Sequence, residues 1–380
     1  MRPLDGIRVV EMAGLAPSPY CGMILADFGA QVVIVDRLTR GVPEIPNVMT
    51  RNPFDRGKRS MRINLKSPQG VEIVKGMIRD FDVLLEPYRP GVMEGLGLGP
   101  DEALSLNPKI VYARLTGWGQ KGPYASMAGH DINYIALSGA LSLFRRKGER
   151  PLPPCNLLGD FAGGGMLCAM GILLALMERN RSGQGQVVDA AMVDGAASFS
   201  TFFFGMLAHE LMTLDIGNNM LDGGAPYYQA YETADGKFMS VGAIESRFYK
   251  ELLEGMGLDP ASLPDQNNKE KWPEMRARFA EVFKTKTRDE WSAIFEGKDA
   301  CVAPVIGLEE VGNHPHNRER DLLVDIQGVL QPAPAPRLSR TPGTALGPGG
   351  PRGANTREVL IELGHPEKEV DALFKQGIVE

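Results

Sequence analysis

Hydrophobic and polar positions in the first part of the chain follow two alternating periods. Apolar residues occur at helical spacing in residues 19–29 and 67–81, and the second segment starts with Ser67 as an N-cap before Pro68. Short runs of β-branched and aliphatic residues, typical of buried strands, cover residues 6–13, 31–37, 82–88 and 109–117. This alternation predicts an α/β fold with a mainly parallel sheet that is covered by helices on both faces.

Residues 161–177, "FAGGGMLCAMGILLALM", form a long apolar stretch without charge. The stretch lies at the lower limit of length for a membrane-spanning helix. Its three consecutive glycines, residues 163–165, permit close backbone approach, which a packed interior would use. We therefore predict a buried core helix and no membrane span.

The pattern changes in the second half of the chain. Residues 227–245 alternate like a β-hairpin that turns at Asp235 and Gly236, and residues 267–297 have the spacing of two amphipathic helices. We place a domain boundary at this change of pattern. The predicted domains are a large α/β domain over residues 1–221, a small α+β domain over residues 222–330, and a C-terminal segment, 331–380, that returns to the large domain.

Composition and charge exclude some classes of function. The chain has 41 basic and 47 acidic residues and a net charge of −6, so we expect no nucleic-acid partner. The four cysteines form no CxxC pair and are predicted to be buried thiols of an intracellular protein. We recognise no signal peptide, and the last residues, "KQGIVE", match no peroxisomal tripeptide.

One acidic residue suggests a dinucleotide site, and its surroundings argue against it. Asp36 ends the second predicted strand, where a ribose-binding acid would lie. The first turn, "EMAGLAPSPYCG", lacks the GxGxxG motif and contains Pro17 and Pro19, which would obstruct a tight phosphate-binding turn. We therefore predict that neither NAD nor FAD binds here.

Basic residues gather where the predicted strands end. They are Arg37, Arg56, Lys58, Arg59, Lys66 and Arg89. In an acidic protein, such a cluster suits a polyphosphate ligand at the carboxyl ends of the strands, for example an acyl carrier with a nucleotide handle. The alternative, that these charges belong to solvated loops, is equally open.

His130 and Asp160 are candidates for acid–base chemistry. His130 precedes a predicted helix, whose N-terminus favours the neutral imidazole, and Asp160 begins the 161–177 helix, where unpaired N–H groups favour a carboxylate. The alternative stays open that Asp160 is a plain N-cap and His130 a helix-edge packing residue. Glu245, at the end of the hairpin, could orient an imidazole or could simply be a surface residue.

No metal site is predicted, because no HExxH or Walker motif is present and His314 and His316 fit a solvated loop.

Taken together, several stretches resemble the α-methylacyl-CoA racemase branch of the family III CoA-transferase superfamily. The resemblance covers residues 2 to 340, and the pair GHDINY and GDFAGGG is specific to the racemase branch. The stretches are "GLAPSPYCGMILADFGAQVVIVDR", "RGKRS", "LLEPYRPGVME", "ARLTGWGQKGPY", "AGHDINYIALSGAL", "NLLGDFAGGGM", "NMLDGGAPYY" and "TADGKFMSVGAIE".

The resemblance implies a large Rossmann-like, doubly wound CoA-binding domain, a smaller α+β domain and an interlocked homodimer. The active site would lie between the large domain of one subunit and the small domain of the other. It implies a catalytic pair of His130 and Asp160, with Glu245 supporting the histidine. The implied CoA contacts are Arg37, Ile63, Asn64, Leu65, Lys66, Arg89, Gly129, Asp131, Ile132, Asn133 and Tyr134.

The implied activity is the interconversion of (R)- and (S)-2-methylacyl-CoA thioesters through an enolate, with CoA as part of the substrate. It needs no metal, pyridoxal phosphate or nicotinamide. The backbone N–H of Asp131 is the candidate donor to the enolate, and some of the 18 methionines would line the acyl chain. The location would be cytoplasmic in a bacterium, and peroxisomal or mitochondrial in a eukaryote. Two alternatives remain: a CoA-transferase with Asp160 as nucleophile, and a non-catalytic acyl-CoA-binding protein.

Overall fold

The computed structural model describes residues 1–38 and 52–380, which group into two compact units. The first unit comprises Met1–Ala140, Pro154–Phe199 and Asp321–Glu380, and the second comprises Leu141–Pro153 and Ser200–Arg320. The C-terminal segment 331–380 thus lies in the first unit, and residue 222 lies inside the second.

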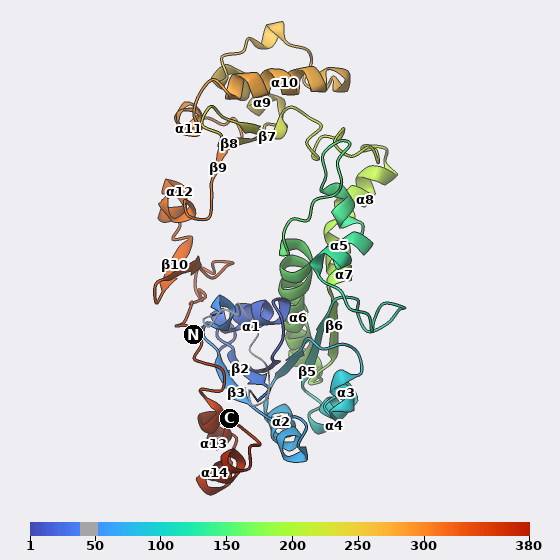
Figure 1. The fold of residues 1–380 in the computed structure, drawn as a ribbon, viewed down its shortest axis with the longest axis vertical. Helices are drawn as coiled ribbons and strands as arrows, with labels where there is room; N and C mark the ends of the chain where they lie inside the picture. Colours follow the sequence, from blue (N-terminus) through green and yellow to red (C-terminus); the bar gives the residue numbers. More distant parts are fainter. Residues whose placement is uncertain (39–51) are drawn as a thin grey trace. The chain divides into compact units, whose positions relative to one another are not determined.

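The first unit is built on a parallel sheet of six strands, in the order β3-β2-β1-β4-β5-β6 (Figure 1). The predicted α/β class with a parallel sheet is confirmed. β2 and β3 lie on one side of β1 and β4, β5 and β6 on the other, so the order reverses between β1 and β4. In such sheets a crevice opens there, at the carboxyl ends of the strands. The strands are β1 (Arg8–Met12), β2 (Gln31–Asp36), β3 (Arg59–Arg62), β4 (Val83–Glu86), β5 (Val111–Thr116) and β6 (Val187–Ala191).

Helices cover both faces of this sheet and enclose two apolar cores. Alternation along β1 divides its residues between them: Val10 and Met12 face one core and Val9 the other. The first core lies under α2 (Pro68–Asp80), α13 (Thr356–Glu362) and α14 (Glu367–Lys375), and the second under α1 (Pro17–Asp27) and α6 (Leu167–Ser182). The remaining helices of this unit are α3 (Val92–Gly95), α4 (Pro100–Leu106), α5 (Asp131–Leu137) and α7 (Met192–Phe199), and a hairpin joins β10 (Leu323–Ile326) and β11 (Val329–Pro332).

The apolar stretch around residues 161–177 is only partly a core helix. It begins as a π-helix, η3 (Leu157–Met166), and continues as α6. One side of α6, including Cys168 and Ile172, is buried against the sheet, whereas Met170, Leu174 and Met177 are exposed. Among the described residues, Leu157–Ser182 alone is long and apolar enough to cross a membrane by length and composition, and 44% of its most apolar window is buried. One apolar face of this helix is therefore left uncovered in the single chain.

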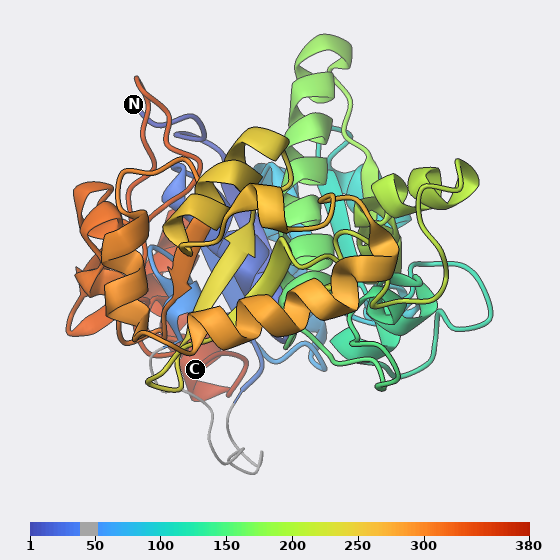
Figure 2. The ribbon, with the colours of Figure 1, turned by 90° about the horizontal axis from the view of Figure 1, so that it is seen from above.

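The second unit contains a small antiparallel sheet with helices packed on it. The predicted hairpin is confirmed as β7 (Tyr228–Glu232) and β8 (Phe238–Gly242), and β9 (Val302–Val305) adds a third strand. Helices α9 (Ser246–Gly255) and α10 (Trp272–Phe283) lie on the same side of it (Figure 1), and α10 is the long orange helix of Figure 2. The other helices are α8 (Thr201–Ala208), α11 (Arg288–Phe295) and α12 (Pro315–Glu319).

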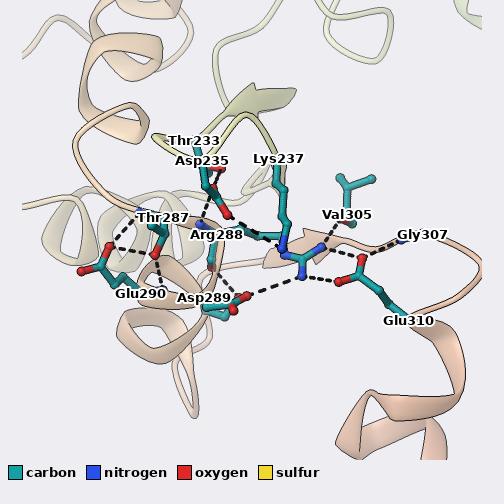
Figure 3. Close-up of polar contacts among 11 residues, drawn as sticks. Thr233, Asp235, Lys237, Thr287, Arg288, Asp289, Glu290, Val305, Gly307 and Glu310 are labelled. Atoms are coloured by element: carbon teal, nitrogen blue, oxygen red, sulfur yellow. Dashed lines mark hydrogen bonds and ion pairs between the residues drawn. The ribbon is translucent and has the colours of Figure 1, made fainter.

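An arginine at the start of α11 ties three segments of the second unit together (Figure 3). The guanidinium of Arg288 donates to both carboxylate oxygens of Glu310, at 2.8 and 2.5 Å, and to the carbonyl of Val305. Its backbone N–H donates to Asp235 in the hairpin turn. Glu310 also accepts from the N–H of Gly307. The bidentate pair thus fixes the segment that follows β9 to α11.

We expect Glu310→Gln to weaken the second unit at neutral pH and to matter little in acid. The hydrogen bonds from Arg288 lower the pKa of Glu310 from 4.5 to about 2. A carboxyl whose folded pKa is depressed stabilises the fold above its unfolded pKa, and that stabilisation is lost as the pH falls toward the folded pKa. Urea unfolding of both proteins checks this. The difference in midpoint between wild type and variant should shrink from pH 5 to pH 3, and a constant difference contradicts the assignment.

Candidate active site

A cavity of about 410 Å³ lies at the carboxyl ends of the strands of the first unit. It lies between the segments that follow β1 and β4, where the order of the strands reverses, and loops after β5 close it. His130 and Asp160 both line it, so the structure brings together two residues that are 30 positions apart in the sequence. The other lining residues are Gly14, Leu15, Pro17, Pro87, Tyr88, Arg89, Pro90, Leu115, Thr116, Gly117, Trp118, Ala125, Met127, Ala128, Gly129, Tyr134 and Met192.

His130 is the N-cap residue of α5 and has extended backbone angles. Its backbone N–H donates to the side-chain oxygen of Asn133 at 3.1 Å, and its carbonyl accepts from the N–H of Asn133 at 2.8 Å. This reciprocal capping fixes the point at which the chain enters the helix. The imidazole is exposed in the single chain and is free to meet a substrate.

Asp160 lies inside the π-helix η3, not at its N-cap, which is Asn156. The interpretation of Asp160 as a plain N-cap is therefore wrong. The side-chain amide of Asn156 donates to the carboxylate of Asp160 at 3.0 Å. Burial raises the pKa of Asp160, the Asn156 hydrogen bond lowers it, the nearby charge of Asp131 raises it and His130 lowers it. A raised pKa brings a carboxyl closer to the range in which it can exchange protons at neutral pH.

Asp131 separates His130 from the rest of α5, and its carboxylate is buried. One oxygen, Oδ2, accepts from the backbone N–H groups of both Gly159 and Asp160, at 2.6 and 2.7 Å. The implied CoA contact of Asp131 therefore falls to its backbone, because its side chain is turned toward η3. Ile132 and Asn133 are exposed.

Tyr134 shapes the loop that leads to His130. Its hydroxyl donates to the carbonyl of Gly129, and its ring packs edge-on against Trp118, with centroids 4.8 Å apart. Any side chain at Gly117 would clash, since a Cβ there would lie 2.1 Å from the tyrosine ring. The loop between β5 and α5 is thus closed around Tyr134, with Gly129 at the cavity wall.

The other implied CoA contacts follow the ends of β2, β3 and β4. Arg37, Lys66 and Arg89 are exposed, and no ion pair among residues 1–38 and 52–380 involves them. The side chain of Ile63 is fully buried, so only its backbone can face a ligand, whereas that of Leu65 is partly buried against the first core. Asn64 accepts the backbone N–H of Lys66 and shapes that turn.

Three other basic residues of the predicted cluster have intramolecular partners. Arg56 is buried and donates to Asp27, and Lys58 is buried against Glu11. Arg59 pairs with Glu362 at 2.7 Å. Because Arg56 and Lys58 are buried with these partners, their charges are already neutralised within the protein. Arg59 is only partly buried, so its contact with a polyphosphate stays a prediction.

Glu245 belongs to the second unit, where it is the N-cap residue of α9. Its support of His130 stays a prediction.

Several cavity residues were not predicted from the sequence. Leu15 and Trp118 lie in turns without a pattern of their own, and the sequence does not single out Met127 and Met192 from the other methionines. The bridging role of Asp131 had no signal either, because its partners lie 28 and 29 residues away. Within residues 1–38 and 52–380, no group of three or more His, Cys, Asp or Glu side chains could hold a metal ion.

The chain is similar over most of its length to proteins of one known family. Residues 4–356 match the model of the family described as CoA-transferase family III. The chain is 52% identical to mouse and 49% identical to human alpha-methylacyl-CoA racemase, each over 99% of this chain and 97% of the relative. The crystal structure of a CAIB/BAIF family protein from Brucella suis superposes with a TM-score of 0.82 at 24% identity, covering 95% of this chain and 99% of that one, and shows the same fold.

Proposed function

Because this chain belongs to CoA-transferase family III, we propose that it is the isomerase of that family, which interconverts (R)- and (S)-2-methylacyl-CoA thioesters. The observation that carries the proposal is the placement of His130 and Asp160 on the wall of one cavity. The names and high identity of the mouse and human relatives support it over a CoA-transferase.

The proposed reaction is a 1,1-proton transfer. A thioester acidifies its α-hydrogen, because the electron pair left on the α-carbon delocalises onto the carbonyl as an enolate. For one epimer, the Asp160 carboxylate removes the α-proton and the imidazolium of His130 protonates the opposite face. For the other epimer, neutral His130 is the base and protonated Asp160 the acid. Each direction therefore needs one of the two groups protonated and the other deprotonated.

The remaining implied contacts complete the proposed site. The backbone N–H of Asp131, at the first position of α5, would donate to the enolate oxygen. Arg37, Lys66 and Arg89, which have no ion-pair partner within residues 1–38 and 52–380, would supply positive charge for the phosphates of CoA at the strand ends. Met127 and Met192, adaptable apolar side chains of the cavity wall, suit a branched acyl group. No metal or organic cofactor takes part in this scheme, and the proposed location is intracellular.

We further propose an interlocked homodimer in which Glu245 of the second unit supports His130 of the other subunit. The uncovered apolar face of α6 supports this, since Met170, Leu174 and Met177 are 50%, 57% and 67% exposed in the single chain. Apolar surface of this extent calls for a partner, and a second copy would cover it.

The dimer proposal predicts a mass of twice 41.3 kDa in light scattering after size-exclusion chromatography. Leu174→Glu places a charge on the uncovered face and should shift the protein toward monomer and lower its activity. Ile361→Glu, on an exposed position of α13, is the matched control and should stay dimeric. A wild-type protein that is monomeric at micromolar concentration would refute the proposal.

The function is tested by incubating one epimer of a 2-methylacyl-CoA with the enzyme in heavy water. We expect deuterium at the α-carbon and loss of optical purity, with no acyl acceptor present. A folded, CoA-binding protein that leaves the α-hydrogen in place would disprove the racemase. Covalent labelling of Asp160 with acyl exchange to a free acid would instead identify the CoA-transferase.

A further inference from the structure

The carboxylate of Asp131 connects the two segments that carry His130 and Asp160. Asp131 follows His130 directly in the chain, and its Oδ2 accepts the backbone N–H of Asp160 itself at 2.7 Å. The same oxygen accepts the N–H of Gly159 at 2.6 Å. One buried side chain therefore spans the start of α5 and the first turn of η3, and through it the two candidate acid–base residues are joined by a single hydrogen bond.

The backbone around Gly159 is packed closely against the carboxylate of Asp131. A Cβ on Gly159 would lie 2.6 Å from Asp131 Oδ2, so glycine is required for the close approach. The second oxygen of Asp131 is buried and, within the described residues, has no hydrogen-bond partner. A buried carboxylate with one oxygen unsatisfied is costly and therefore calls for an explanation.

We propose that Asp131 is a positioning residue, which sets the spacing between His130 and Asp160 and supplies a fixed negative charge beside the latter. This inference rests on the proposed racemase function. A two-base reaction needs both groups at opposite faces of one carbon, and a misplacement of about 1 Å can cost about 100-fold in rate. A tie between the two backbones holds that distance without occupying the cavity.

The charge of Asp131 acts on the proton equilibrium of Asp160 as well. Burial is the largest cause of the raised pKa of Asp160, and the neighbouring Asp131 adds to it, whereas the Asn156 hydrogen bond and His130 oppose it. The titratable and charged groups around this part of the cavity are His130, Asp131 and Tyr134 of α5, and Tyr88 and Arg89 after β4.

Two substitutions separate position from charge. Asp131→Asn keeps a carbonyl oxygen that can accept from both N–H groups, because a single oxygen does so in the wild type, but it removes the charge. We expect its kcat profile against pH to shift, with the limb that reports Asp160 moving to lower pH. Asp131→Ala removes the bridge, and we expect kcat to fall about 100-fold while KM for the CoA thioester changes less than about threefold.

The matched control is Asp82→Asn, which alters another aspartate that accepts a backbone N–H, from Arg8, away from the cavity. Urea unfolding of each variant shows whether it is folded. Gly159→Ala, which crowds the carboxylate and keeps its charge, should lower kcat without shifting the pH profile.

A purely structural role for Asp131 predicts a lower unfolding free energy with unchanged kcat and pH profile in the folded protein, and that result would overturn the inference. If Asp131→Ala does not fold, the pH profile of Asp131→Asn decides. Deuterium exchange by the wild type is measured first, so that failure of the racemase function is seen independently of any variant.

Discussion

We expect His130→Ala to abolish α-proton abstraction from one epimer of a 2-methylacyl-CoA and to spare abstraction from the other. The two faces of the α-carbon are served by different bases in the proposed reaction, and Asp160 is intact in the variant. Removal of a positioned acid or base costs about 10²–10⁴-fold in rate. Racemisation should be lost in both directions, because each direction needs both groups. Deuterium from heavy water should still exchange into the epimer whose α-hydrogen faces Asp160, and this epimer should keep its configuration.

The measurement uses each pure epimer separately, with deuterium content followed by mass spectrometry and configuration by chiral chromatography. Asp160→Asn should give the opposite preference. His365→Ala, outside the cavity in the same unit, is the matched control and should behave as wild type. Equal loss of exchange for both epimers in His130→Ala would rule out separate bases on the two faces.

Lys58→Met is expected to lower the free energy of unfolding by about 3–5 kcal/mol, the usual cost of removing one partner of a buried ion pair. The ammonium of Lys58 lies 2.6 Å from Glu11 in β1 and also donates to the carbonyl of Pro19 in α1, and both charged side chains are fully buried. Without it, Glu11 is left as an isolated charge between sheet and helix. A side chain at Gly22 would occupy the same space, since its Cβ would lie 1.8 Å from the carboxylate.

The pH dependence of the variant follows from the same pair. Burial raises the pKa of Glu11, and Lys58 opposes that rise. In Lys58→Met the opposition is gone, so the carboxyl favours its protonated form in the fold, and stability is lost as the pH rises above the unfolded pKa near 4.5. Urea unfolding at pH 5 and pH 8 checks the slope.

A second substitution tests the explanation. Glu11→Leu combined with Lys58→Met removes both charges and should recover much of the loss, as buried pairs replaced by apolar groups often do. A double variant no more stable than Lys58→Met would show that the cost comes from lost packing and not from the unpaired carboxylate.

Local pattern predicted the elements of this protein well. The alternation of β-branched runs with helical spacing placed β1, β2, α2, β4 and β5, because a strand or helix buried on a sheet must repeat its apolar residues at that element's own period. The hairpin was found for the same reason, with its turn at Gly236, whose φ is +72°. Pattern also singled out His130 and Asp160 as polar residues at the edges of apolar helices.

The sequence could not show how the basic residues and the apolar stretch are used. In the sequence, Arg56, Lys58 and Arg59 look the same as Arg37 and Arg89. Only packing decides which of these cations pair with a carboxylate of the same chain. The 161–177 stretch is apolar on all sides, so its sequence does not show which face is buried. The structure shows it, because the sheet covers one side of α6 and leaves the other exposed.

By itself, then, the chain determined the α/β class, the order of its elements and the two chemical groups of the site, since these depend on residue type and local period. Only the tertiary structure decided that His130 and Asp160 share one cavity and that Asp131 joins their backbones. The physical reason is that the hydrogen bond from Asp160 to Asp131 joins residues 29 positions apart, so it depends on how β5, α5 and η3 pack together. The local spacing of apolar residues does not encode that packing.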